Sequence, residues 1–98
     1  MTETKRRIDG RLLNDAQSVE YWCQQLYRWM RWVGEDGYPE IELYEPSFLA
    51  QLRQRDPEID RVMPMILRDL ARMWFEPEHS FARQVDARMG TDFARRLP

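Results

Sequence analysis

The sequence has 98 residues, enough for one domain with its own hydrophobic core. It contains 15 Lys and Arg residues and 17 Asp and Glu residues. The resulting net charge of −2 argues against a protein that binds polyanions non-specifically. With one cysteine and no apolar run near the ~18 residues of a membrane span, we expect a cytoplasmic protein without membrane contact.

The charges are unevenly distributed along the chain. Residues 1–49 carry six basic and nine acidic residues, whereas residues 50–98 carry nine and eight. The acidic excess is concentrated in residues 35–45, so an acidic middle precedes a more basic C-terminal end. Fourteen of the fifteen basic residues are Arg, which favours bidentate contacts to phosphate or carboxylate, although an Arg-rich genome would give the same bias.

Residues 1–13 are polar and basic, and we expect a loosely held basic arm before a single helical domain over residues 14–98. The triplet Lys5, Arg6 and Arg7 could touch phosphates, but a solvated terminus is the ordinary interpretation. Leu12 and Leu13 could anchor the end of the arm against the first helix.

The clearest pattern covers residues 16–34, where apolar residues recur at spacings of three and four and predict an amphipathic helix. Asn14 or Asp15 can cap its start, and Gly34 can end it. Cys23 lies on the apolar stripe and is interpreted as a small buried hydrophobe. The stripe consists of Val19, Trp22, Cys23, Leu26, Trp29, Met30 and Val33.

A neighbouring face of the same predicted helix carries Tyr21, Arg28 and Trp32. Two interpretations are open. Either the apolar arc is wide and wraps into the core, or these three residues are partly exposed and contact a protein partner.

The next stretch, residues 40–45, alternates charged and apolar residues like a strand, but no partner strand is evident. We therefore expect an extended acidic connector that lays Ile41 and Leu43 on the core. A short helix should follow over residues 46–55.

A second long helix is predicted from Asp56 as N-cap and Pro57 as first helical residue, continuing to residue 75. Because a proline inside a helix costs about 3 kcal/mol, we expect the run to kink at Pro64 or to split there into two helices, and we favour the split. The predicted core is formed by Trp22, Leu26, Met30, Ile66, Leu70 and Trp74.

At the C-terminal end, Ser80 can cap a helix that Gly90 closes, and residues 91–97 can form a final turn or two. Two short helices joined at a glycine have the outline of a helix-turn-helix. The expected fold is all-α: a small single-domain bundle of four to five helices with a C-terminal helix-turn-helix-like pair.

Catalytic and metal-binding patterns are missing from the sequence. His79 and Cys23 are far apart, and nothing indicates activation of the thiol. No His/Cys cluster has metal-ligand spacing, and there is no glycine-rich phosphate loop. We expect neither an enzyme nor a bound metal or cofactor.

Three stretches together resemble the compact antitermination proteins of the Q type found in phages, whose C-terminal half is similar to the helix-turn-helix of sigma-factor region 4. They are YRWMRW followed by GEDGYP, then DPEIDRVMPMILRDL, then SFARQVDARMGTDFARRL. The resemblance implies an aromatic N-terminal helix that faces RNA polymerase and a C-terminal pair that faces duplex DNA. The implied DNA-binding residues are Arg83, Arg88, Arg95 and Arg96.

Asp86 departs from this pattern, because such motifs place a small residue four positions before the turn glycine and a carboxylate there would be costly to bury. Three hypotheses remain open. The chain is a phage or prophage transcription regulator acting through DNA and RNA polymerase, or a small phage protein that binds and inhibits a host protein without binding DNA. The third is a structural or oligomerising helical domain, such as a homodimer.

Overall fold

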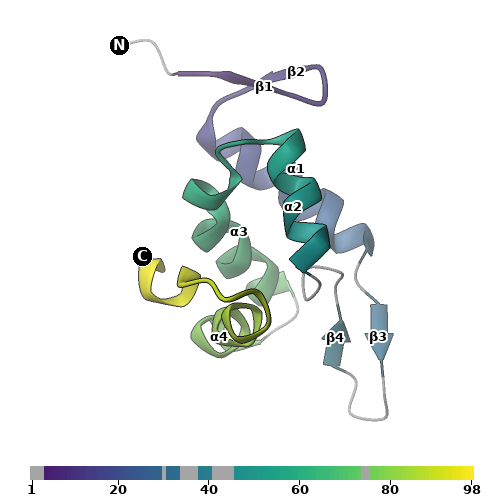
Figure 1. Ribbon diagram of the computed structural model, residues 1–98, viewed down its shortest axis with the longest axis vertical. Coiled ribbons are helices and arrows are strands. Elements are labelled where there is room, and N and C mark those ends of the chain that lie inside the picture. Colours follow the sequence, from purple (N-terminus) through teal and green to yellow (C-terminus); the bar gives the residue numbers. More distant parts are fainter. Residues whose placement is uncertain (1–3, 30, 34–37, 41–45, 74–75) are drawn as a thin grey trace.

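The computed structural model describes residues 4–29, 31–33, 38–40, 46–73 and 76–98 (Figure 1). Within these ranges the fold is mostly helical, which confirms the predicted all-α class with four α-helices and a closing 3₁₀ turn. In chain order the elements are β1 (Arg6–Ile8), β2 (Arg11–Leu13), α1 (Asp15–Trp29), β3 (Arg31–Val33), β4 (Tyr38–Glu40), α2 (Pro46–Arg55), α3 (Ile59–Met73), α4 (Glu78–Met89) and η2 (Phe93–Arg96).

Helices α1 and α3 form the centre of the domain and run in the same direction. Asp15 at the start of α1 accepts a hydrogen bond from Arg61 near the start of α3, and further along the Cys23 thiol lies 3.6 Å from the Ile66 carbonyl oxygen. Helices α2 and α4 pack on α3, and η2 folds back onto α3 and α4. The two central helices therefore have their C-terminal ends on the same side of the domain.

The core is drawn from every helix and from the N-terminal strands. Of the six predicted core residues, Trp22, Leu26, Ile66 and Leu70 are fully buried, which confirms the assigned faces of α1 and α3. Met30 and Trp74 lie outside the described residues. No helix in the described part of the chain is long and apolar enough to cross a membrane.

The N-terminal stretch is a β-hairpin, which differs from the loosely held arm expected for residues 1–13. β1 pairs antiparallel with β2, with Ile8 opposite Arg11. Asp9 and Gly10 both have positive φ, 49° and 80°, and such a two-residue turn matches the twist of the flanking strands. Ile8 is fully buried in the helical core, so the hairpin is part of the domain that was expected to begin at residue 14.

The first helix starts at Asp15 but ends at Trp29, well before Gly34. Residues 31–33 form β3, which pairs antiparallel with β4, so the predicted helix end is wrong. Of the predicted connector only Glu40 is described, and it pairs with Arg31 at the end of β4. Arg-Trp-Val is a sequence with high strand propensity, and the glycine-containing stretch after it is typical of a hairpin loop. Ile41 and Leu43 lie outside the described residues.

Helix α2 covers the predicted residues, whereas α3 differs from its prediction. It runs without interruption through Pro64, so the predicted split is wrong. Pro64 stands in the second turn, where its missing N–H deprives only the Asp60 carbonyl of a helical partner. Its ring is buried, and this burial offsets the lost hydrogen bond.

Helix α4 begins at Glu78, two residues before the predicted cap Ser80, and it ends as predicted at Gly90. Gly90 has φ 68° and ψ 36°, and its N–H donates to the Asp86 carbonyl oxygen at 2.8 Å. This left-handed cap is one that glycine adopts without strain. It turns the chain into η2, whose Phe93 is buried in the core.

Candidate functional site

Asp86 holds the C-terminal turn in place. Its carboxylate accepts hydrogen bonds from the Thr91 hydroxyl at 2.6 Å, the Phe93 N–H at 2.8 Å and the Ala94 N–H at 2.9 Å. These donors lie at the start of η2, where backbone N–H groups have no helical acceptor. The carboxylate is thus compensated, which explains how an acid occupies a position where a small residue was expected.

The two arginines of η2 are bound by a neighbouring acid. Arg95 Nη2 lies 2.7 Å from Asp92 Oδ2, and Arg96 Nε lies 3.4 Å from Asp92 Oδ1. The Arg96 guanidinium also lies over the Phe93 ring, 5.3 Å from its centroid. Because one carboxylate faces both cations, η2 offers an anion much less positive charge than its two arginines suggest.

The other two predicted DNA-binding arginines, Arg83 and Arg88, are exposed on α4. Five positions apart on a helix, they project about 140° away from each other. Arg83 and Arg88 therefore do not share one face of α4.

The length of η2 is also unlike that of a recognition helix. η2 has four residues in 3₁₀ geometry and is about 8 Å long along its axis. A recognition helix lies in the major groove of DNA, which is about 12 Å wide. Its N-terminal donors are already bound by Asp86. The helix-turn-helix outline is present in the connectivity, but the second helix is a single turn.

Tyr21, the first residue predicted to contact a protein partner, is half-buried and makes several contacts within the chain. Its hydroxyl donates to Asp9 Oδ2 at 2.5 Å, its ring packs edge-to-face on Trp22, and Arg11 lies over its face at 5.5 Å from the centroid. Burial, followed by the hydrogen bond to Asp9, raises the pKa of Tyr21. Tyr21 therefore ties the hairpin to α1.

Arg28, the second residue predicted to contact a protein, is exposed near the end of α1 and makes no ion pair with a described residue. Trp32 lies in β3, and its side chain falls outside the described part of the chain. Two large apolar residues near the ends of these helices are also exposed: Tyr27 on α1, 46% exposed, and Met73 on α3, 45% exposed. Tyr27 and Arg28 lie in the last turn of α1, and Met73 is the last residue of α3.

Sequence reasoning missed the most highly charged cluster, which is centred on Asp56. The Asp56 side chain is fully buried and accepts hydrogen bonds from Arg6 Nε at 2.9 Å, Arg6 Nη2 at 3.0 Å and Trp22 Nε1 at 3.0 Å. It also accepts from the Glu58 N–H at 3.1 Å, which is the capping role that was predicted. Burial alone would raise the pKa of Asp56, but the bonds from Arg6 and Trp22 outweigh it and lower the pKa.

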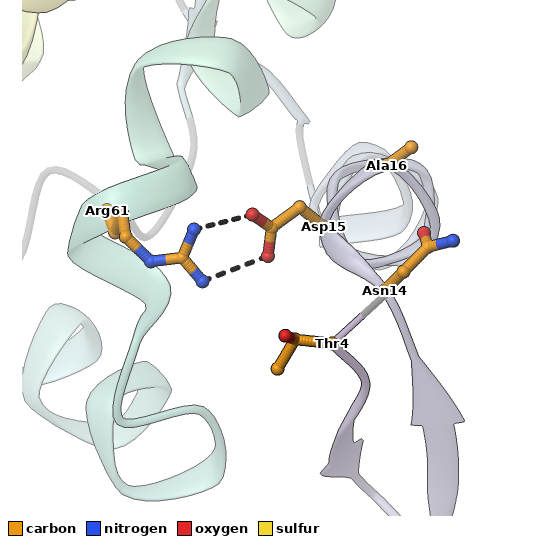
Figure 2. A pocket seen from close by; sticks show the side chains of 5 residues that line it. All are labelled: Thr4, Asn14, Asp15, Ala16 and Arg61. Atoms are coloured by element: carbon orange, nitrogen blue, oxygen red, sulfur yellow. Dashed lines mark hydrogen bonds and ion pairs between the residues drawn. The ribbon is translucent and has the colours of Figure 1, made fainter. Parts of the chain in front are cut away.

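The cluster continues to the surface through Asp15, which binds both Arg6, at 2.7 Å, and Arg61. The hydrogen bonds from Arg61 are the largest cause that lowers the pKa of Asp15, to about 2. Figure 2 shows Asp15 and Arg61 hydrogen-bonded to each other in the lining of an open depression of about 580 Å³. Thr4, Asn14 and Ala16 complete its lining.

The two charged groups that line this depression are paired with each other. Its carboxylate and guanidinium bind each other, so neither is poised for acid, base or nucleophilic catalysis. Burial raises the pKa of the Cys23 thiol to about 12, which keeps the sulfur protonated at neutral pH. Among the described residues no group of three or more His, Cys, Asp or Glu is arranged to hold a metal ion.

Comparison with protein-family models, with curated proteins and with solved structures gave no match. The resemblance to Q-type antitermination proteins therefore stays a prediction from the sequence, and function has to be argued from the geometry of the described residues.

Proposed function

We propose that this chain is a small protein-binding domain of the phage type that acts on a host protein and does not read DNA sequence. The observation that carries the proposal is that the polar groups of the C-terminal turn, η2, are already bound by acids of the same chain. Asp86 binds the N–H groups at the start of η2, and the single carboxylate of Asp92 balances one of the two charges of Arg95 and Arg96, so the element expected to enter DNA is short and carries reduced positive charge.

The best-supported contact surface is the C-terminal end of the α1 and α3 pair. Arg28, Tyr27 and Met73 are exposed there on rigid helices. Arginine, tyrosine and methionine are enriched at the centres of protein interfaces relative to the rest of protein surfaces. Bacterial RNA polymerase is the first partner to test, because the sequence resemblance implies that the N-terminal helix faces it.

Binding to purified RNA polymerase core and holoenzyme, measured by biolayer interferometry, tests this proposal. Arg28→Glu should weaken binding about tenfold or more, as expected for an arginine near the centre of an interface. Arg83→Glu is the matched control, since Arg83 is an exposed helical arginine without an ion pair to a described residue. Equal effects of the two substitutions, or no binding of wild type, would remove RNA polymerase as the partner.

Contact with duplex DNA is the second candidate, in the role of a transcription regulator. It is favoured by Arg83, which is exposed on α4, the first helix of the helix-turn-helix outline. Such contact would reach phosphates only, because α4 would be the supporting helix of the pair.

A further inference from the structure

A further depression lies between the N-terminal hairpin and α1. Its volume is about 220 Å³, and the residues that line it come from β2 and α1. Directly opposite residues of a hairpin share a face, so Arg11 lies on the same face as the buried Ile8, on the side turned toward the helices. The lining consists of Arg11 and Leu13 of β2 and of Gln17, Glu20, Tyr21 and Gln24 of α1.

The walls of this depression are positioned by regular structure. The four lining residues of α1 are separated by three and four positions, so their side chains are neighbours on one face of the helix. The hairpin wall is fixed by contacts outside the depression, because Ile8 is buried in the core and the Tyr21 hydroxyl donates to Asp9 in the hairpin turn. The depression is therefore formed before a ligand binds.

Two opposite charges line the depression without pairing with each other. Arg11 and Glu20 are exposed, and neither forms an ion pair with a described residue. The pKa of Asp9 is lowered mainly by its hydrogen bond from Arg55, and Arg11 adds only a smaller, longer-range effect. The Arg11 guanidinium lies over the Tyr21 ring, 5.5 Å from its centroid. A cation–π contact uses the face of the guanidinium and leaves its N–H donors for a carboxylate.

This pair of charges favours a small zwitterion over a simple ion. An anion would bind Arg11 but would be repelled by Glu20, and a cation would meet the reverse. A molecule that carries both a carboxylate and an ammonium group satisfies both side chains. Gln17 accepts the Asn14 N–H through its amide oxygen at 3.0 Å, which leaves its own amide N–H groups as further donors to the ligand carboxylate.

We propose that the depression is a binding site for a free α-amino acid with an apolar side chain. The α-carboxylate binds Arg11 and the α-ammonium group binds Glu20. The apolar side chain lies against Leu13 and the ring of Tyr21, which are both half-buried. The site is small and open, so we expect a dissociation constant of about 1 mM. A bound amino acid bridges β2 and α1 and thereby stabilises the folded state.

Titration of isotope-labelled protein with L-leucine, followed by the amide chemical shifts of residues 11–24, tests the proposal. These shifts should change and saturate at a few times the dissociation constant. N-acetyl-L-leucine lacks the ammonium charge and L-leucinamide lacks the carboxylate, so each should bind about tenfold more weakly. Unchanged shifts at about 20 mM L-leucine, or equal affinity for the three compounds, would overturn the proposal.

Substitutions assign each charge of the ligand to its partner. Glu20→Gln should weaken L-leucine binding about tenfold but should not weaken binding of N-acetyl-L-leucine, which has no ammonium group. Arg11→Gln should likewise weaken binding of L-leucine but not of L-leucinamide. Arg7→Gln is the matched control, because Arg7 lies on the opposite face of the hairpin and outside the depression. Equal losses of L-leucine affinity in Arg7→Gln and Arg11→Gln would place the amino acid elsewhere and refute the site.

Discussion

Arg6 and Asp56, fifty residues apart in sequence, form a bidentate ion pair whose carboxylate is entirely buried. The indole N–H of Trp22 donates to the same carboxylate, so strand β1, helix α1 and the junction before α3 meet at one side chain. Partnered in this way, the charge is tolerated in the core, but removing one partner leaves the others without compensation.

Replacing Asp56 should therefore be much more damaging than replacing an exposed acid. Asp56→Ala leaves Arg6 and the Trp22 N–H facing a cavity, and we expect a loss of about 3 to 5 kcal/mol in the free energy of unfolding. Asp60→Ala is the control, because Asp60 is also bound by an arginine through two hydrogen bonds but is 44% exposed. It should cost about 1 kcal/mol or less in the same urea titration.

The free energy of unfolding should fall at acid pH, over a range determined by the pKa values of the paired carboxylates. Ion pairing lowers the pKa values of Asp9, Asp15 and Asp56 in the folded state. A carboxyl whose pKa is lower in the folded state adds to the free energy of unfolding at pH values above its unfolded pKa, which is near 3.9. This contribution is lost as the pH falls through the folded pKa. For Asp15 that value is about 2. Urea titrations from pH 5 to pH 2 should show the loss, with a shallower slope in Asp56→Asn.

Deleting residues 1–13 should prevent folding rather than trim a dispensable tail. The deletion removes Ile8 from the core and leaves the buried Asp56 without Arg6. The combined loss, about 5 kcal/mol or more, is comparable with the whole stability of a small domain. A deleted chain that melts cooperatively at the wild-type temperature would show that the hairpin is a loosely held arm after all.

Asp86→Ala should loosen the C-terminal turn while leaving the rest of the domain folded. Loss of a capping carboxylate costs about 1 to 2 kcal/mol, and the Phe93 and Ala94 amides should lose their protection from hydrogen exchange. Asp92→Ala is the control, because Asp92 binds exposed arginines and makes no capping hydrogen bond. It should leave the protection of these two amides unchanged.

The fold was predictable where a pattern is local. The three-four spacing in α1 and α3 identified the faces that bury Leu26 and Ile66, and the Gly90 cap was placed correctly. The N-terminal hairpin also had a local signal, since Asp9-Gly10 between two short strands is typical of a two-residue turn. The continuity of α3 was not predicted, because the low helix propensity of proline was considered without the burial of the Pro64 ring that offsets it.

The candidate site was less predictable, because its contacts join distant parts of the chain. No spacing rule links Arg6 to Asp56, and the sequence signal at Asp56 indicated only a helix cap. Tyr21 was predicted from its periodicity to contact a partner, but the spacing did not show that its hydroxyl bonds to Asp9 of the hairpin turn. The pairing of Arg95 and Arg96 with Asp92 is local by contrast, because spacings of three and four residues are those of helical ion pairs, and the sequence analysis did not use them.

Titration of fluorescent random-sequence duplex DNA with the protein, followed by anisotropy across salt concentrations, tests the central claim most directly. If the C-terminal unit does not read or grip DNA, wild type and Arg95→Ala with Arg96→Ala should bind equally weakly at about 50 mM salt, with the same shallow dependence on salt. Tight binding whose log-log salt slope falls by about 0.9 for each arginine removed would contradict the account and identify η2 as a DNA-binding element.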